Sequence, residues 1–428
     1  MKAEIDHNSR RVLVLALVGF TIAFAVWTMF GVLGIPIRQE FDLSKTQLSW
    51  LLAAAALGGT IPRLWTGIMT DKYGGRIVFP IMLLLPVPAL VLMLFVNSFE
   101  ALIALAVWAG ISGNTFSIGI AWCSAWYPPQ RQGLALGVFG AGNIGAALTK
   151  LIGPSLLAVV PAAGYLGGVI PGGWRFIAFI YIFMLIVMAC SIMVFAPKPD
   201  RKPGRGRPFM EMHEPLRHLR VWRFGLYYVV VFGAYVALSM WLPRYYVDVF
   251  GLSLTVAALL TALYIFPASL LRPVGGWLSD RLGPRVVTFI SFGSMVGVGL
   301  FLSIPGLVKS VGVFAALVFI IGVAMGIGKA SVYRFIPDYY PRDVGAVGGL
   351  VGLLGAAGGI FLPPLFAYGE TLAGFPEATW LILLFFSLSC LIWLSLAGDH
   401  SLSTVEIEER RNGRQPVSLP EVAAASEN

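Results

Sequence analysis

Two arginines lie inside long apolar segments, where a charged side chain is costly. Arg63 stands eight residues before the acidic residue Asp71, and Arg272 stands eight residues before Asp280. Because eight residues of helix rise about 12 Å, both guanidinium groups are predicted to lie near the middle of a membrane. A central arginine costs at least about 2.5 kcal/mol to insert, so each is expected to face a protein cavity and to have a partner.

No carboxylate is placed to be that partner. All 21 Asp and Glu residues fall in loops, tails or segment ends, and Asp248 and Asp338 come closest to the core. We therefore predict that the missing counter-charge is the substrate, a small planar oxyanion gripped by two guanidinium groups that match its oxygens in pairs. The alternative is that both arginines bond backbone carbonyl groups or extend to the aqueous boundary.

Composition indicates an all-α membrane protein. Of the 428 residues, 58% are hydrophobic and 12% are charged, and the mean hydropathy is +0.83. Apolar segments of about 20 residues, long enough for a hydrocarbon core of about 30 Å, recur along the chain. We predict twelve transmembrane helices, at 12–36, 47–70, 77–96, 101–125, 133–160, 174–196, 223–246, 255–278, 286–304, 311–336, 345–368 and 377–398. The first is too long for a signal sequence and is expected to be retained.

The basic residues predict the orientation. One side carries most of them, namely a basic linker after the sixth segment and the loop residues Lys72, Arg76, Arg131, Arg281, Arg285 and Arg342. By the positive-inside rule, both termini and the linker are predicted to be cytoplasmic, in a multi-pass protein of the cytoplasmic (inner) membrane. The net charge of +9 then reflects topology, and no nucleic-acid partner is expected. The three cysteines lie inside apolar segments and suggest no metal site.

The two halves of the chain repeat each other. Arg63 and Arg272 are 209 residues apart, and further identities recur at this offset: Gly67 with Gly276, Asp71 with Asp280, Gly74 with Gly283, and Arg76 with Arg285. We predict two pseudosymmetric six-helix halves, at 1–196 and 223–398. A cytoplasmic basic linker at 197–222 joins them, and a disordered cytoplasmic tail is expected at 399–428.

The repeated element GxxxDxxGxR, with Gly67, Asp71 and Arg76 in one copy and Gly276, Asp280 and Arg285 in the other, suggests a mechanical role. Glycine permits a tight turn, and the acidic and basic residues can latch neighbouring helix ends when the inner side is closed. The element resembles the loop motif of the major facilitator superfamily, and with the repeat and linker the resemblance covers nearly the whole chain. It implies the major facilitator fold, with the substrate between the halves near the bilayer midplane. A monomer is expected.

Glycine-rich segments occupy equivalent places in the two halves. The relevant glycines are Gly137, Gly140, Gly142 and Gly145 in the fifth segment and Gly349, Gly352, Gly355 and Gly358 in the eleventh. Because glycine costs about 1 kcal/mol relative to alanine inside a helix, close helix packing is one explanation. Together with one arginine per half, the stretches GVFGAGNIG and GGLVGLLGAAGG resemble the paired motifs of the nitrate/nitrite porter family.

That resemblance implies nitrate, with nitrite, as substrate. Carried over by position, Arg63 and Arg272 would grip the anion and Asn143 would donate to it, beside the aromatic residues Phe116, Tyr228 and Phe232. Ordinary packing is the alternative for these aromatics. A flat, weakly hydrated anion suits a narrow slot between aromatic faces, whereas tetrahedral sulfate or phosphate should fit poorly.

Accumulation of an anion requires coupling, since entry into a negative-inside cell costs about 2.3 kcal/mol per 100 mV. None of the four histidines lies in an apolar segment, so Lys150 and Lys329 are the candidates for proton coupling. The stretch GIGKASVY around Lys329 resembles the proton-coupled symporter branch, and we favour nitrate/proton symport. The alternatives are nitrate/nitrite antiport, a carrier of another small anion, and a nontransporting anion sensor. Neither an enzyme nor a cofactor is expected, because no catalytic constellation appears at membrane depth.

Overall fold

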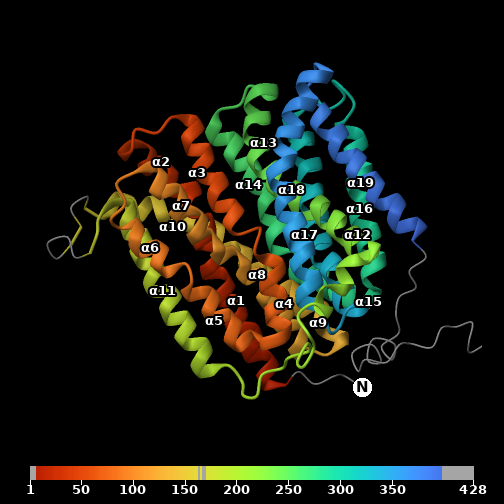
Figure 1. Cartoon of the computed structure of the whole chain (residues 1–428). Coiled ribbons are helices and arrows are strands. Elements are labelled where there is room, and N and C mark those ends of the chain that lie inside the picture. Colours follow the sequence, from red (N-terminus) through yellow and green to blue (C-terminus); the bar gives the residue numbers. More distant parts are fainter. Residues whose placement is uncertain (1–5, 162–163, 166–169, 398–428) are drawn as a thin grey trace, which may run out of the picture.

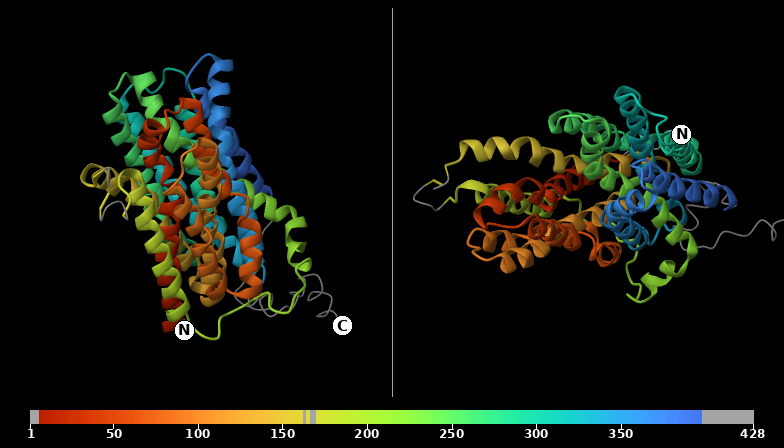
Figure 2. Two further views of the ribbon diagram at one scale, coloured as in Figure 1. Left: turned by 60° about the vertical axis from the view of Figure 1, so that its left-hand side comes forward. Right: turned by 90° about the horizontal axis from the view of Figure 1, so that it is seen from above.

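The computed structural model describes residues 6–161, 164–165 and 170–397. Within these residues the chain is helical throughout, and the sole β pairing is an isolated bridge between Tyr165 and Ile170. The helices form one bundle in which the N-terminal half, red to yellow, lies beside the C-terminal half, green to blue (Figures 1 and 2). The predicted all-α fold is confirmed, and the predicted tail at 399–428 lies outside the described residues.

The N-terminal half contains eleven of the labelled α-helices, several of which continue one another. They are α1 (His7–Thr28), α2 (Phe30–Glu40), α3 (Lys45–Gly58), α4 (Arg63–Tyr73), α5 (Gly75–Leu84), α6 (Val87–Met93), α7 (Phe99–Gly110), α8 (Thr115–Trp126), α9 (Gln132–Gly140), α10 (Gly145–Val159) and α11 (Gly173–Phe195). Short 3-10 turns connect α7 to α8, α8 to α9 and α9 to α10: η1 (Ile111–Asn114), η2 (Pro129–Arg131) and η3 (Ala141–Ile144).

The C-terminal half follows the same plan with fewer interruptions. Its helices are α12 (Leu219–Tyr228), α13 (Ala234–Phe250), α14 (Leu254–Leu270), α15 (Arg272–Leu282), α16 (Pro284–Leu302), α17 (Val311–Tyr339), α18 (Val344–Ala373) and α19 (Ala378–Leu396). A π-helical turn, η6 (Val229–Gly233), joins α12 to α13. Helix α12 begins four residues before the predicted start of this half at 223.

The described helices account for the twelve predicted segments. Ten stretches are long and apolar enough to cross a membrane, and the bent pair Val256–Leu270 and Arg272–Leu282, which meet at 42°, makes an eleventh. The remaining prediction, 133–160, coincides with α9, η3 and α10, which together run from Gln132 to Val159. Large apolar side chains such as Phe266 and Phe385, each 67% exposed, face outward, as expected for a surface covered by lipid.

The two halves meet on the side of the bundle that carries the linker, here called the linker side, through two equivalent helix crossings. At one crossing, Asp71 of α4 accepts hydrogen bonds from the backbone N–H groups of Gly345 (2.8 Å) and Ala346 (3.1 Å) at the start of α18. At the other, Asp280 of α15 accepts from Gly133 and Leu134, both at 2.8 Å, at the start of α9. Each carboxylate thus caps a helix N-terminus of the opposite half, where the helix dipole favours negative charge.

The arginines of the repeated loop element bond within their own halves. Arg76 donates to the carbonyl of Met193 near the end of α11 (2.6 Å), and Arg285 donates to the carbonyl of Leu394 near the end of α19 (3.1 Å). These carbonyls belong to last helical turns, which lack intrahelical donors. In this structure the acidic residues therefore hold the halves together, while the basic residues hold α11 and α19 in place. We refer to the Asp71 and Asp280 contacts together as the linker-side gate.

Glycine allows the crossings to form. A Cβ atom on Gly67 would lie 1.9 Å from the carbonyl oxygen of Gly345, and one on Gly276 would lie 1.9 Å from that of Gly133. Real Cβ atoms do not approach an oxygen so closely, so each pair of backbones needs glycine to come into contact. The same glycines that shorten the helix separation bring Asp71 and Asp280 within reach of the helix ends that they cap.

We expect Gly276→Ala to destabilise the folded chain by about 1–3 kcal/mol, because the added methyl group must force α9 and α15 apart. The measurement is the thermal unfolding midpoint of the purified chain in detergent. Gly297→Ala on the neighbouring α16 is the matched control, since nothing lies within 4 Å of its Cβ position, and it should raise the midpoint slightly or leave it unchanged. Equal midpoints for the two variants would contradict the tight crossing.

Candidate functional site

Both arginines stand directly after a helix break. Helix α3 ends at Gly58 and α4 begins at Arg63, while α14 ends at Leu270 and α15 begins at Arg272. Proline explains the breaks, because Pro62 and Pro273 lack the N–H group that would continue the helical hydrogen-bond ladder. The repeat thus places each guanidinium where backbone carbonyl groups have lost their helical donors.

Arg63 is 1% exposed and uses two donors on backbone oxygens. Its Nε donates to the carbonyl of Gly59 (2.7 Å), which the break leaves without a helical partner, and its Nη1 donates to the carbonyl of Gly352 on α18 (3.1 Å). The guanidinium carbon lies 4.9 Å from the ring centre of Trp27. Arg63 therefore links the two halves through backbone carbonyl groups, as the alternative to anion binding predicted for this residue.

Arg272, equally buried at 1% exposure, is bonded far less. Its Nη2 donates to the hydroxyl of Tyr228 at 3.3 Å, a long contact for a charged donor. Its Nε and Nη1 are buried and have no hydrogen-bond partner among the described residues. Since a buried donor without an acceptor costs about 1–3 kcal/mol, and more when charged, these atoms mark where an anion would be stabilised.

A single aromatic ring lies against both charges. The ring centre of Phe116, on α8 just after the η1 turn, is 5.7 Å from the guanidinium carbon of Arg63 and 5.4 Å from that of Arg272. Cations are attracted to the face of such a ring, so Phe116 helps to hold two like charges in one buried region. The structure therefore brings Arg63 and Arg272 together at the interface of the halves.

The other predicted aromatics lie on the Arg272 side. Tyr228 and Phe232 are stacked, with ring centres 5.1 Å apart and planes 9° from parallel. Tyr228 directly precedes the π-helical turn η6 and Phe232 lies within it, and such turns are frequent at functional sites. The rings thus form one wall beside the unpaired donors of Arg272.

The glycine-rich segments lie against the arginine helices of the opposite halves. A Cβ on Gly137 would lie 2.4 Å from the carbonyl oxygen of Arg272, and one on Gly349 would lie 2.6 Å from that of Arg63. One turn further, a Cβ on Gly140 would lie 2.5 Å from Nε of Arg272, and one on Gly352 would lie 2.8 Å from the Tyr333 hydroxyl. These four glycines make room for the site itself.

The other four serve close packing. A Cβ on Gly142 would lie 2.6 Å from Phe20 and one on Gly145 would lie 2.1 Å from the Thr21 carbonyl oxygen, both on α1. In the other half, Gly355 approaches the ring of Tyr228, and Gly358 approaches the backbone of Gly233. Every glycine of the two segments therefore lies in a close approach, and Gly355 adjoins the site region through Tyr228.

The polar candidates occupy different surroundings. Asn143 is buried in η3, three residues after the Gly140 that packs on Arg272. Lys329 on α17 is fully buried, donates to the carbonyl of Ala268 (3.0 Å), and lies 3.1 Å from the ring centre of Tyr235 and 5.7 Å from that of Phe232. It has no acidic partner among the described residues. Lys150 is part of α10, but its side chain lies outside the described part of the structure.

Three residues of this region were not among those predicted from the sequence. Trp27 covers Arg63, Tyr235 covers Lys329, and Tyr333 stands between the two arginine regions, edge-on to Phe116 (5.3 Å) and to Tyr228 (4.7 Å). The Tyr333 hydroxyl donates to the carbonyl of Gly348 (2.9 Å). A signal existed for Tyr333, because it follows Lys329 by four residues and so lies on the same helix face. None existed for Trp27, which is one apolar residue among many.

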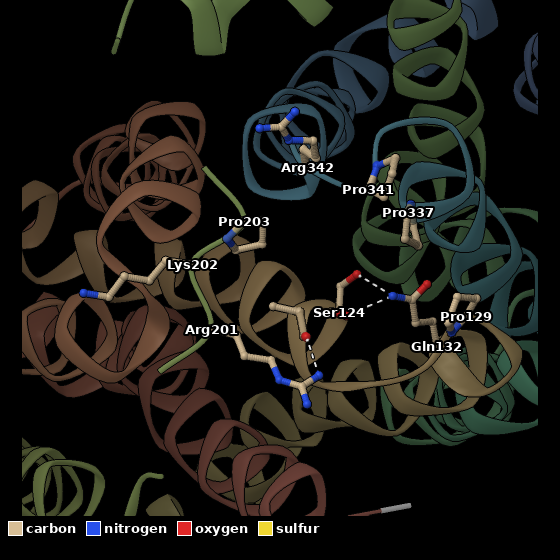
Figure 3. A pocket seen from close by; sticks show the side chains of 10 residues that line it. Ser124, Pro129, Gln132, Arg201, Lys202, Pro203, Pro337, Pro341 and Arg342 are labelled. Carbon is tan, nitrogen blue, oxygen red and sulfur yellow. Dashed lines mark hydrogen bonds between the residues drawn. The ribbon is translucent and has the colours of Figure 1, made fainter. Parts of the chain in front are cut away.

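A cavity opens on the linker side, and neither Arg63 nor Arg272 is among the residues that line it (Figure 3). Its volume is about 320 Å³, and it is lined by both halves and by the linker: Ser124, Ala125, Pro129, Gln132, Arg201, Lys202, Pro203, Pro337, Pro341 and Arg342. In Figure 3 the charged ends of Lys202 and Arg342 both point away from Ser124 and Gln132. The cavity thus marks the seam where the linker covers the junction of the halves.

Comparison with known proteins agrees with this architecture. The family model of the Major Facilitator Superfamily matches residues 15–363 and 249–421. A Thermus thermophilus protein named "Probable nitrate/nitrite antiporter NarK1" is 55% identical over 402 residues, which cover 90% of this chain and 91% of the relative. The chain belongs to the nitrate/nitrite porter family of the major facilitator superfamily. The "Nitrite extrusion protein" of Bacillus subtilis is 30% identical over 342 residues, covering 80% of this porter and 82% of the relative.

Solved structures show the same fold in this porter. The Escherichia coli fucose:proton symporter FucP superposes with a TM-score of 0.71 at 18% sequence identity, covering 91% of this chain and 98% of the other. The predicted major facilitator fold with two pseudosymmetric halves is therefore confirmed. The similarity to this solved structure concerns the fold alone, and the family membership rests on the sequence relatives.

We expect Gly140→Ala to lower nitrate uptake about tenfold or more, since its methyl group would push the Arg272 guanidinium out of position. Uptake of labelled nitrate into proteoliposomes measures this, normalised to the amount of folded porter in the membrane. Gly348→Ala is the control, because its Cβ would meet its nearest neighbour at 3.4 Å, an ordinary contact. Uptake by Gly140→Ala equal to that of the control would show that the position of Arg272 is not critical.

Proposed function

We propose that this porter carries nitrate, and with it nitrite, across the cytoplasmic membrane by alternating access, with the anion held between Arg63 and Arg272. The observation that carries the proposal is the pair of buried Arg272 donors, Nε and Nη1, that lack partners among the described residues. A singly charged planar anion would satisfy them and would neutralise part of the buried charge. The names of the two sequence relatives support the same substrates.

The two arginines would have unequal roles. Arg63 already donates to Gly59 and Gly352 and lies against Trp27, so it is held in place and contributes mainly positive potential. Arg272 has two buried donors, Nε and Nη1, without partners among the described residues, so it would be the primary anion ligand in this state. Asn143 and the rings of Phe116, Tyr228 and Phe232 would complete a flat slot, which suits nitrate better than a tetrahedral anion.

The linker side is assigned to the cytoplasm. The excess of basic residues in the linker and in the loops on that side supports this orientation by the positive-inside rule. Both chain termini would then be cytoplasmic. With Asp71 and Asp280 capping helices of the opposite half, this arrangement would be the state in which the cytoplasmic pathway is closed.

For the energy source we favour symport with protons, through Lys329. A fully buried ammonium group that bonds one neutral carbonyl and lies against two aromatic rings is a candidate proton carrier, since it has no acidic partner among the described residues. Entry of the anion would favour the protonated lysine, and its exit would release the proton. Lys150 is retained as a second candidate.

The second candidate mechanism is exchange of nitrate for nitrite. The name of the 55% identical relative, a probable antiporter, favours it. In that mechanism, both anions would use the same arginines in opposite directions, and Lys329 would contribute fixed positive charge. Proton coupling would then be unnecessary, because exchange of two singly charged anions moves no net charge.

Replacement of Arg272 by lysine, which keeps the charge but loses the planar fork, should reduce nitrate uptake about 10- to 100-fold, equivalent to the roughly 1.5–3 kcal/mol of a charged hydrogen bond. Arg63→Lys should reduce it as well, and should also lower the thermal midpoint because its backbone bonds join the halves. Arg244→Lys is the control, because Arg244 is exposed and pairs with Asp248. Uptake at the control rate in both site variants would rule out the anion clamp.

Coupling is tested in proteoliposomes under two conditions: an inward proton gradient with an empty lumen, and internal nitrite without a gradient. Symport predicts uptake in the first condition, and Lys329→Met should abolish this uptake and make nitrate binding to the purified porter weaker and independent of pH, since the coupling between proton and anion is reciprocal. Uptake only with internal nitrite would overturn symport and establish exchange. Competition by an organic acid such as lactate would instead indicate a broader anion carrier.

A further inference from the structure

The linker between the halves is folded onto the protein rather than hanging free, and we call residues 197–218 the strap. Its first anchor is Asp200, whose carboxylate accepts from the indole N–H groups of Trp122 and Trp126, both at 3.0 Å, and from the backbone N–H of Arg76 at 2.9 Å. All three donors belong to the N-terminal half. Asp200 thus fastens the start of the strap to α5 and α8.

The next anchors lie at the crossing of α4 and α18. The backbone N–H of Gly204 donates to the carbonyl of Asp71 (3.0 Å). Arg207 forms an ion pair with Asp343 (2.6 Å), the residue directly before α18, and both side chains are largely buried, at 18% and 12% exposure. Fully buried Met212 packs against Ile68 of α4 and Ala346 of α18. The strap therefore covers the site where Asp71 caps α18.

The two crossings of the linker-side gate are completed differently. At the Asp280 crossing, Arg334 of α17 donates to Asp280 (2.8 Å), to Asp338 and to the carbonyl of Pro129 (2.6 Å). At the Asp71 crossing, the capping carboxylate forms no ion pair among the described residues, and the nearby cation is Arg207 of the strap. The strap thus supplies at one crossing the positive charge that a membrane helix supplies at the other.

Chain length limits how far the crossing can open while the strap stays attached. Gly204 bonds the N-terminal half and Arg207 bonds the C-terminal half, and three residues span at most about 11 Å when fully extended. Met212 also sits between the two helices. Separation of α4 from α18 on this side must therefore pull the strap off at least one half.

From these contacts we infer that the strap is a third component of the linker-side gate, which docks across α4 and α18 when this side closes and must detach from Asp343 and Ala346 before it opens. Burial raises the pKa of the Asp343 carboxyl, and the Arg207 guanidinium opposes that shift, so docking helps to keep the ion pair charged. Loss of Arg207 should shift the porter toward the open state of this side.

Gate opening can be measured without any transported substrate, by the rate at which a cysteine at Ala346 reacts with a bulky maleimide. Ala346 is fully buried, and replacing Cys190, the exposed native cysteine, with serine removes background labelling. In the purified full chain, Arg207→Gln should speed labelling about fivefold, the factor that corresponds to an ion pair of about 1 kcal/mol. Arg205→Gln is the matched control, because Arg205 is an exposed arginine of the same strap.

A charge exchange distinguishes the ion pair from a general disturbance of the strap. Arg207→Asp combined with Asp343→Arg should return the labelling rate toward that of the parent, whereas each single change should raise it. Equal labelling of Arg207→Gln and Arg205→Gln, or failure of the exchange to restore slow labelling, would overturn the inference. This outcome is independent of whether nitrate is the substrate.

A covalent tether tests whether detachment is required. Cysteines at Arg207 and Asp343, joined by a short reducible crosslinker in proteoliposomes, should reduce nitrate uptake at least tenfold, and reduction should restore it. Uptake at the untethered rate by fully crosslinked porter would overturn the need for release. Absence of uptake by the untethered parent would count against the proposed substrate, while the labelling assay would still decide the role of the strap.

Discussion

A buried guanidinium that has no carboxylate partner among the described residues is the constraint on which the rest of the structure depends. Away from water, two positive charges at the junction of two helix bundles would oppose folding unless backbone oxygens, aromatic faces or a bound anion stabilised them. Arg63 obtains the first two through Gly59, Gly352 and Trp27. Arg272 obtains less, and this difference between the halves is the reason for proposing Arg272 as the anion ligand.

The surrounding irregularities follow from that constraint. The helix breaks before both arginines leave carbonyl groups without helical donors. Glycines at equivalent positions of the two halves let α9 and α18 approach the helices that carry the arginines. A π-helical turn places Tyr228 and Phe232 in the same region. Each feature costs stability in an isolated helix. In the assembled bundle, contacts with the opposite half compensate for the stability that these features cost. The proposed anion binding and the association of the two halves would therefore depend on the same residues.

On the linker side, too, a few hydrogen bonds join the two halves. Asp71 and Asp280 close it by capping helix ends, an interaction that forms or disappears with small movements because hydrogen bonds act over short distances. Such contacts suit a gate that must open and close repeatedly. The strap adds a contact that crosses both halves, so among the described residues the Asp280 crossing is completed by Arg334 of a membrane helix and the Asp71 crossing by the strap.

Local pattern was sufficient to predict the all-α membrane fold, the internal repeat and the burial of Arg63 and Arg272, because apolar length and residue spacing are properties of the chain read in order. Local pattern did not predict the unequal bonding of the two arginines, the positions of Trp27 and Tyr235 over Arg63 and Lys329, or the docking of the strap. Each of these depends on which residues that are far apart in the sequence come into contact. Such contacts are set by the packing of the helices against one another and not by any spacing along the sequence.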